Sequence, residues 1–402
     1  MFERYSHYLA YGATDQKTVI DLVGKYEGLI VPGTVAAFQR EGTGGFVLSL
    51  SAIPGAPPYL IDPRFPLFQR TLDKPKKSHI ALANLLGAPG LIGLVDPAPS
   101  DFDDELVETV ARNWVEFNTN YEQRQAGKFE KYAKRLEEEI DQDAAHGPSG
   151  IIAPYLVSQG DDWWQRSDAL LKATVKAAPE GENVLRVVAV AAVAELDVRL
   201  GQIEDERAIL WVSDLKELTA DSRDLAAYGE AIRAADQRGQ STFALYGGFF
   251  AVLLAGLGLK GACHGIGYGE HRSWPELPRS GPPPARYYAP RFHRYIGQDL
   301  AYQLWSRDAD LTACTCPVCD NGSPVLGYHD LMKHSVFARQ AEIDRWGGLE
   351  LAESADLLEV EREQLEEDLA GIELPEPLRD PVDRATAHLP RWIEALDQLR
   401  AE

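Results

Sequence analysis

The chain lacks several features that would assign it to large classes of protein. No apolar run approaches the roughly 20 residues that a membrane helix needs, and the N-terminus has no signal-peptide character. Basic residues are scarce, since 40 Lys and Arg stand against 62 Asp and Glu and give a formal charge of -22. A protein this acidic does not bind nucleic acid over its whole surface. Any site for a polyanion must therefore consist of Lys and Arg residues that cluster locally. We expect a cytoplasmic protein that does not bind membranes.

Two catalytic signatures are also missing. The glycines of segment 265–270 do not have the spacing of a dinucleotide-binding fingerprint, and no ribose-binding acid follows them in a strand-then-helix unit. The predicted strands carry no clustered histidines of the kind that hold a catalytic metal. These absences disfavour a Rossmann dehydrogenase. They leave a metal-dependent barrel hydrolase only as a weaker alternative.

Cysteine is rare, with four in the chain, yet Cys314, Cys316 and Cys319 lie within six residues. This spacing lets thiolates turn toward one ion, and a His from a following helix can complete the tetrahedron that structural Zn²⁺ prefers. A disulfide is the less favoured interpretation, because adjacent Cys-x-Cys sulfurs are poorly placed to bridge each other. We predict His334, rather than His329, as the fourth ligand. Cys263, in a distant apolar run, is expected to be a small buried residue.

The spacing of apolar segments predicts an α/β fold. Short apolar runs that alternate with helical patterns are typical of a parallel sheet buried on both faces, and eight such runs favour a (β/α)₈ TIM-type barrel. The predicted strands cover residues 29–34, 46–50, 59–69, 151–157, 185–190, 208–214, 242–248 and 261–267. A further short apolar run at 91–95 is a candidate accessory strand. We expect the barrel over 1–300, a zinc-binding subdomain over 301–345 and a helical tail over 346–402, with tail helices at 351–370 and 382–401.

In such a barrel, polar residues at the carboxyl ends of strands face the active site. A carboxylate there can act as general base or as nucleophile, although capping the next helix or pairing with a cation are alternatives. This rule selects the catalytic candidates Asp62, Asp214 and Glu270. It also selects four residues for substrate binding: Gly247, Gly248, His264 and Arg272.

A basic and aromatic segment follows the last predicted strand. It includes Arg272, Arg279, Arg286, Arg291, His293 and Arg294, interleaved with Trp274, Tyr287, Tyr288, Phe292 and Tyr295. Aromatics beside arginines suit stacking on bases and contact with phosphates. The alternative is an irregular loop that supports the zinc module.

Taken together, these motifs resemble the tRNA-guanine transglycosylases. The family's Pro-Val-Gly-Thr motif is similar to the strand Val31 to Thr34. Its Asp-Ser-Gly-Gly-Phe-Gln motif is similar to the strand that ends at Asp62, with Phe68 and Gln69 beyond it. Its cysteine motif is similar to the cysteine trio of this chain. The cysteine pattern is the specific part, and the resemblance spans roughly residues 28–345. It implies a barrel enzyme in which one aspartate attacks C1′ of a guanosine and a second, at the position of Asp62, acts as general acid and base.

The chain also departs from the family pattern. The Phe-Asp-Cys nucleophile motif, the Gln-Gly-Gly base-recognition strand and the Pro-Thr-Arg segment are absent, and Arg345 stands where the family has its distal histidine. The resemblance therefore leaves Glu270 and Asp214 as alternatives for the nucleophile. Loss of the tRNA-reading parts is similar to the divergent DpdA-type branch, which inserts a 7-deazaguanine such as preQ0 into DNA.

The leading hypothesis is thus replacement of guanine in DNA through a covalent carboxylate intermediate. The candidate partners are DNA, the deazaguanine base, an ATPase and a second copy of the chain. Two alternatives stay open. One is a transglycosylase that acts on tRNA, and the other is a catalytically inactive barrel that is stabilised by zinc and binds nucleic acid.

Overall fold

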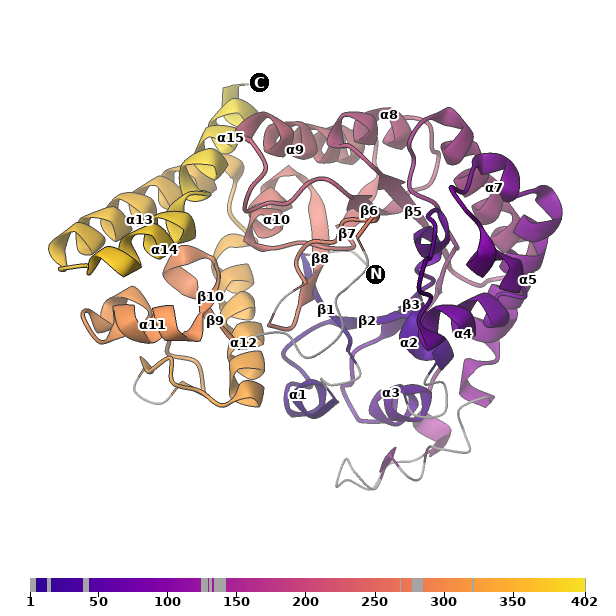
Figure 1. Cartoon of the computed structure of the whole chain (residues 1–402), viewed down its shortest axis with the longest axis horizontal. Helices are drawn as coiled ribbons and strands as arrows, with labels where there is room; N and C mark the ends of the chain where they lie inside the picture. The colour runs from indigo at the N-terminus through magenta and orange to yellow at the C-terminus, as the bar shows by residue number, and fades with distance from the viewer. Residues whose placement is uncertain are drawn as a thin grey trace.

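Eight parallel strands form the centre of the molecule (Figure 1). The computed structural model describes residues 5–12, 16–38, 43–123, 129, 132–133, 142–267, 269–276, 285–319 and 322–401. The strands are β1 (Ser6–Ala10), β2 (Gly28–Pro32), β3 (Tyr59–Asp62), β4 (Ile151–Ile152), β5 (Val184–Val190), β6 (Arg207–Val212), β7 (Ser241–Ala244) and β8 (Leu259–Gly265). Their spatial order is β3-β2-β1-β8-β7-β6-β5-β4.

The sheet curls into a nearly closed barrel. The first and last strands of the barrel pair in parallel, with Tyr8 opposite Cys263. At the two ends of the strand order, the Ser149 N–H, just before β4, donates a 2.9 Å hydrogen bond to the Tyr59 carbonyl in β3. The predicted TIM-type barrel is therefore confirmed. All eight carboxyl ends point to one face, where active sites of this fold lie.

Two of the predicted strands were wrong, and one strand was missed. Residues 46–50 belong to helix α3 (Thr43–Ser51), all of which is buried, and residues 91–95 overlap a 3₁₀ turn, Pro89–Gly93. A short apolar run cannot be distinguished from a buried helix by periodicity. The missed strand is β1, whose residues Ser6 to Leu9 are buried although the segment mixes polar and aromatic side chains. The strand count of eight was right because the count did not include residues 91–95, and the missed β1 takes the place of residues 46–50.

Helices surround the barrel and cover the outer face of its strands (Figure 1). Helix pairs such as α5 and α7 also pack on each other. The described barrel helices are α1 (Gln16–Asp21), α2 (Gly33–Phe38), α3, α4 (Lys77–Leu85), α5 (Asp104–Thr119), α7 (Asp161–Ala177), α8 (Leu196–Leu200), α9 (Ser222–Gln237) and α10 (Phe249–Leu253). None of the helices in the described part of the chain is long and apolar enough to cross a membrane.

The remaining elements form a layer on one side of the barrel (Figure 1). The hairpin of β9 (Arg286–Ala289) and β10 (Arg294–Gly297) is antiparallel. The helices that follow it are α11 (Gln298–Trp305), α12 (Tyr328–Trp346), α13 (Leu351–Gly371), α14 (Glu376–Thr386) and α15 (Leu389–Ala401). One apolar core joins barrel residues such as Phe249 to Trp346 of α12 and Trp392 of α15.

The predicted tail helix 382–401 is two helices rather than one. It breaks at Ala387 and His388, and α15 begins at Leu389 with Pro390 in its first turn. Proline suits the first turn of a helix, whereas in the middle of a continuous helix it would clash with the preceding turn. The break lets the buried His388 donate from Nε2 to the Phe292 carbonyl at 3.0 Å. The tail is thereby hydrogen-bonded to the turn between β9 and β10.

Candidate active site and metal centre

The four predicted zinc ligands come together in the structure. The ligand atoms of Cys314, Cys316, Cys319 and His334 all lie within 4.8 Å of one another. The three cysteines are partly buried in the loop between α11 and α12, where the Cys319 N–H bonds to the Cys316 carbonyl at 3.1 Å and closes a turn. His334 is fully buried on α12. Cys263 is buried elsewhere in the barrel, as predicted.

The donor set fits a structural zinc ion. The Nδ1 atom of His334 lies 3.5 Å from the Cys316 sulfur and 3.3 Å from the Cys319 sulfur. A tetrahedral Zn²⁺ site with ordinary bond lengths places such atoms about 3.6 Å apart. The other ring nitrogen, Nε2, donates to the Tyr288 carbonyl at 2.6 Å, which leaves Nδ1 as the ligand atom. Tyr287 stacks on the ring with centroids 4.2 Å apart. Four protein ligands would complete the coordination sphere of a zinc ion, which is typical of a structural site.

A cavity of about 540 Å³ opens at the carboxyl ends of the barrel strands. Its wall includes Ala10 after β1, Pro32 at the end of β2, Arg64 after β3, Tyr246 after β7 and Gly265 at the end of β8. This is the mouth where barrel enzymes bind substrate. Of the predicted site residues, Arg272 lines this cavity.

Asp62 lies beneath this cavity and is fully buried. Its Oδ1 accepts hydrogen bonds from the Tyr155 hydroxyl at 2.9 Å and the Arg64 N–H at 3.0 Å. Its Oδ2 forms a 2.6 Å ion pair with the Arg64 guanidinium, which also contacts the Tyr246 hydroxyl. Arg64 has a left-handed backbone, with φ 55°, and it is Arg64 rather than Asp62 that reaches the cavity. The carboxylate expected at the mouth is thus covered by its own cation.

The other predicted residues are spread around the strand ends. Asp214 is exposed, and its backbone N–H bonds to the Ala191 carbonyl at 3.1 Å. His264 is buried and donates from Nδ1 to the Gly247 carbonyl at 2.7 Å, and burial lowers its pKa well below the ordinary value. Asp214, His264 and Gly247 do not line the cavity at the barrel mouth. Arg279, from the basic and aromatic segment, lies outside the described residues.

Two glutamates meet in a second cavity of about 640 Å³ beside the first. Glu270 follows β8, as predicted, and Glu217 follows β6. Gly269 and His271 line both cavities and so separate them. The Oε2 atoms of the two glutamates lie 2.6 and 3.3 Å from the point that a β-carbon on Gly248 would occupy. A side chain at this glycine would therefore displace the Glu217 carboxylate.

Glu217 is held by the first turn of α10. Its Oε1 accepts from the Gly248 N–H at 2.8 Å, and its Oε2 accepts from the Phe250 N–H at 3.1 Å. Burial, together with the nearby Glu270 carboxylate, raises the pKa of Glu217 to about 7, although the two N–H groups act against this shift. Near neutral pH, Glu217 can therefore both give and take a proton. Gly248, predicted to bind substrate, thus binds the Glu217 carboxylate through its backbone.

Glu270 has a different environment. Its Oε1 forms a 2.6 Å ion pair with Arg339 of α12, and this cation opposes the pKa increase that burial causes. Arg339 is buried, forms a second ion pair at 2.8 Å with Glu342, and lies over the Tyr288 ring at 4.8 Å. The two glutamates therefore differ, because one is held by neutral amides and the other by a guanidinium. Such a pair can divide acid and nucleophile roles.

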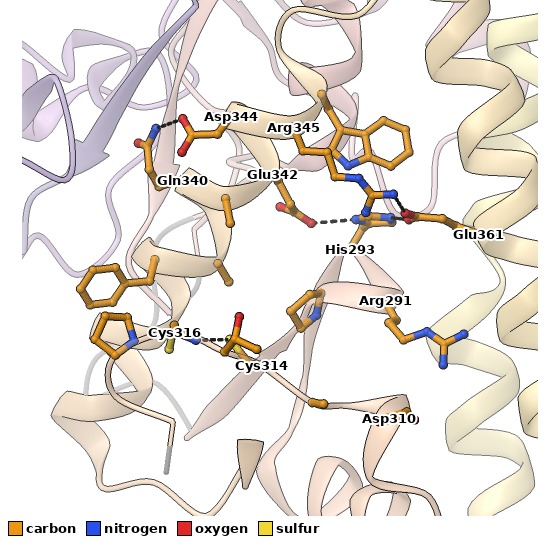
Figure 2. A pocket seen from close by; sticks show the side chains of 18 of the residues that line it. Arg291, His293, Asp310, Cys314, Cys316, Gln340, Glu342, Asp344, Arg345 and Glu361 are labelled. Atoms are coloured by element: carbon orange, nitrogen blue, oxygen red, sulfur yellow. Dashed lines mark hydrogen bonds and ion pairs between the residues drawn. The ribbon is translucent and has the colours of Figure 1, made fainter. Parts of the chain in front are cut away.

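The ion pairs continue from Arg339 to a third cavity of about 1030 Å³ beside the zinc ligands. Figure 2 shows His293 between Glu342 and Glu361 at this cavity. Its Nδ1 lies 2.7 Å from Glu342, and its Nε2 lies 3.1 Å from Glu361. Burial alone would lower the pKa of His293, but the two carboxylates raise it. The chain of charges ties α12, α13 and the hairpin turn to the Glu270 carboxylate.

Sequence reasoning found Glu270 and the zinc ligands but missed Glu217. The signal available was the place of Glu217 shortly after the sixth strand, three residues beyond Asp214. The strand-end rule selected the first carboxylate after the strand, whereas the structure turns the second one inward. The sequence matches no protein-family model and no curated protein.

Proposed function

We propose that the chain is a base-exchange transglycosylase that replaces guanine in DNA with a 7-deazaguanine. The observation that carries the proposal is the Glu217 and Glu270 pair in the cavity beside the mouth of the barrel. Both carboxylates line one cavity and approach the same point above Gly248, yet their partners differ. The confirmed barrel and the Cys₃His cluster, in the arrangement that the resemblance implies, support the same function.

In this proposal Glu270 is the nucleophile. Its ion pair with Arg339 opposes the pKa increase that burial causes and so favours the charged carboxylate, and an oxygen of that carboxylate attacks C1′ of the target nucleotide. The bond from C1′ to the guanine nitrogen breaks, and its electron pair leaves with the base. Glu217, with a pKa of about 7, supplies the proton that the leaving base takes up.

The second half of the exchange reverses these roles. The incoming deazaguanine loses its ring N–H proton to the Glu217 carboxylate, and the freed nitrogen attacks C1′. The bond between C1′ and Glu270 then breaks, which restores both glutamates. The neighbouring cavity of about 540 Å³, with the Tyr246 and Arg272 side chains in its wall, has room for a flat base. Base exchange needs no redox cofactor.

The zinc ion has a structural role in this proposal. Held by Cys314, Cys316, Cys319 and His334, Zn²⁺ would fix α12 against the hairpin, and α12 carries Arg339. The metal thereby supports the guanidinium that orients Glu270. Such reduced thiolates are maintained in the cytoplasm, which we propose as the compartment.

The test is incorporation of a labelled base. The purified protein, with and without a partner ATPase, is incubated with preQ0 and either DNA or tRNA, and the nucleosides are identified by mass spectrometry. We expect the deazaguanine in DNA, and we expect Glu270→Gln to abolish it. Incorporation into tRNA alone would favour a tRNA transglycosylase. No incorporation, together with no exchange of labelled guanine, would indicate an inactive barrel.

A further inference from the structure

Five cations gather around the cavity that holds Glu217 and Glu270. They come from four parts of the fold: the loop after β6, the β9–β10 hairpin, α14 and α15. Two of the four are helices of the C-terminal tail, which the sequence suggested was a separate unit. The five residues are Lys216, Arg286, Arg294, Arg384 and Arg391. The chain has a formal charge of -22, so a cluster of five cations around one cavity needs a physical explanation.

None of the five forms an ion pair of 4.0 Å or less with a described residue, although most arginines in the described part of the chain do. Arg294 donates to the Arg384 carbonyl at 2.8 Å, and Arg391 donates to the Leu218 carbonyl at 2.6 Å. The Nε atoms of both arginines are buried without a hydrogen-bond partner. A buried donor without an acceptor costs free energy, so each guanidinium group has one Nε–H that a bound acceptor could satisfy.

The two carboxylates of the cavity offset the charge of these five cations only in part. Glu270 is already paired with Arg339, and Glu217 is close to half protonated near pH 7. Burial lowers the pKa of Arg294. The Glu270 carboxylate opposes this shift, whereas the nearby Arg286 and Arg391 add to it, because these cations repel one another. A surplus of positive charge around a concave site attracts an anion and strengthens its binding.

We propose that these cations bind phosphodiester groups of the nucleic-acid strand whose nucleotide reaches Glu270. Guanidinium groups match phosphate oxygens with pairs of hydrogen bonds, and a strand carries such phosphates on either side of the target nucleotide. The identification of the strand rests on the proposed function, whereas the binding of phosphate rests on the cation cluster. The tail is therefore part of the substrate site, because α14 and α15 supply Arg384 and Arg391.

The test uses the full chain and two variants chosen for exposure. Arg286 and Arg384 are exposed, and neither side chain forms a hydrogen bond or ion pair with a described residue, so Arg286→Gln and Arg384→Gln should fold. The matched control is Arg112→Gln, an exposed arginine on α5 on the far side of the barrel. Binding of a fluorescein-labelled single-stranded DNA is measured by anisotropy over a range of salt concentrations. Transfer RNA and inorganic phosphate are tested as competitors.

We expect the double variant Arg286→Gln, Arg384→Gln to bind the DNA on the order of tenfold more weakly, with Arg112→Gln unchanged. The slope of log affinity against log salt should fall by about 0.7 for each phosphate that the variant no longer neutralises. Displacement of the DNA by tRNA supports a site for phosphodiesters of either strand. Equal binding by the double variant and the wild type would overturn the inference, as would the absence of DNA binding by the wild type. Loss of base exchange with DNA binding intact would instead refute the proposed function alone.

Discussion

The Glu217→Gln variant should change the free energy of unfolding in a way that depends on pH. Burial raises the pKa of Glu217 from 4.5 to about 7, so between these values the folded protein holds a proton that the unfolded chain has released. The stabilisation that this proton provides is complete below the unfolded pKa and is lost as the pH rises through the folded pKa. A glutamine at this position does not titrate, and it therefore removes the dependence.

The magnitude follows from the two pKa values. Between about pH 5 and pH 8, the wild type should lose about 2.5 kcal/mol of stability relative to the variant, and about 2 kcal/mol once partial screening by water in the cavity is included. At the acidic end Glu217→Gln should be the less stable protein, because its amide nitrogen cannot accept from either the Gly248 or the Phe250 N–H. The difference should shrink or reverse as the pH rises.

The measurement is urea unfolding of both proteins across this pH range. Glu394→Gln, which removes an exposed carboxylate from α15, is the control for lowering the charge of an acidic chain. A stability difference between Glu217→Gln and the wild type that stays constant with pH would refute the reasoning, because it would mean that Glu217 titrates alike in the folded and unfolded states.

Three other variants test the residues that hold the site in place. Cys316→Ser removes one thiolate, so we expect loss of zinc by atomic emission and a lower melting temperature, whereas Cys263→Ala should keep its zinc. Arg339→Met leaves two buried carboxylates without their shared cation and should cost about 3–5 kcal/mol in urea unfolding; a loss below about 1 kcal/mol would contradict the buried ion pairs. Asp62→Asn should destabilise the barrel by releasing Arg64 but leave the zinc content unchanged, and zinc loss would show that the two sites are not independent.

Local patterns in the sequence were enough to predict the cluster of three cysteines and one histidine. The three cysteines lie in one short loop, and one helical segment carries the histidine, so spacing alone brings the ligands together. The barrel was predictable for a similar reason, because short apolar runs separated by helices have few other solutions. The interpretation of residues 46–50 as a strand failed because the apolar residues of α3 are buried on every side and show no helical periodicity.

The arrangement of the carboxylates could not be predicted, because it depends on packing between distant segments. Asp62 does end β3, but the left-handed backbone of Arg64, which turns its cation onto that carboxylate and keeps it from the cavity, has no sequence signal. Glu217 is a partly buried acid that accepts hydrogen bonds from the first turn of α10, which starts 32 residues later in the chain. The contribution of the tail was missed for the same reason, since Arg384 reaches the cavity only after α14 packs beside the hairpin.

Trapping the covalent intermediate tests the central claim most directly. The protein is incubated with a guanine-containing DNA strand and no incoming base, the reaction is denatured, and any adduct is mapped by peptide mass spectrometry. The account predicts an adduct on Glu270 in the wild type and none in Glu270→Gln, while Arg112→Gln forms it normally. An adduct on Asp62 or Asp214, or one that persists in Glu270→Gln, would contradict the assignment of Glu270 as the nucleophile.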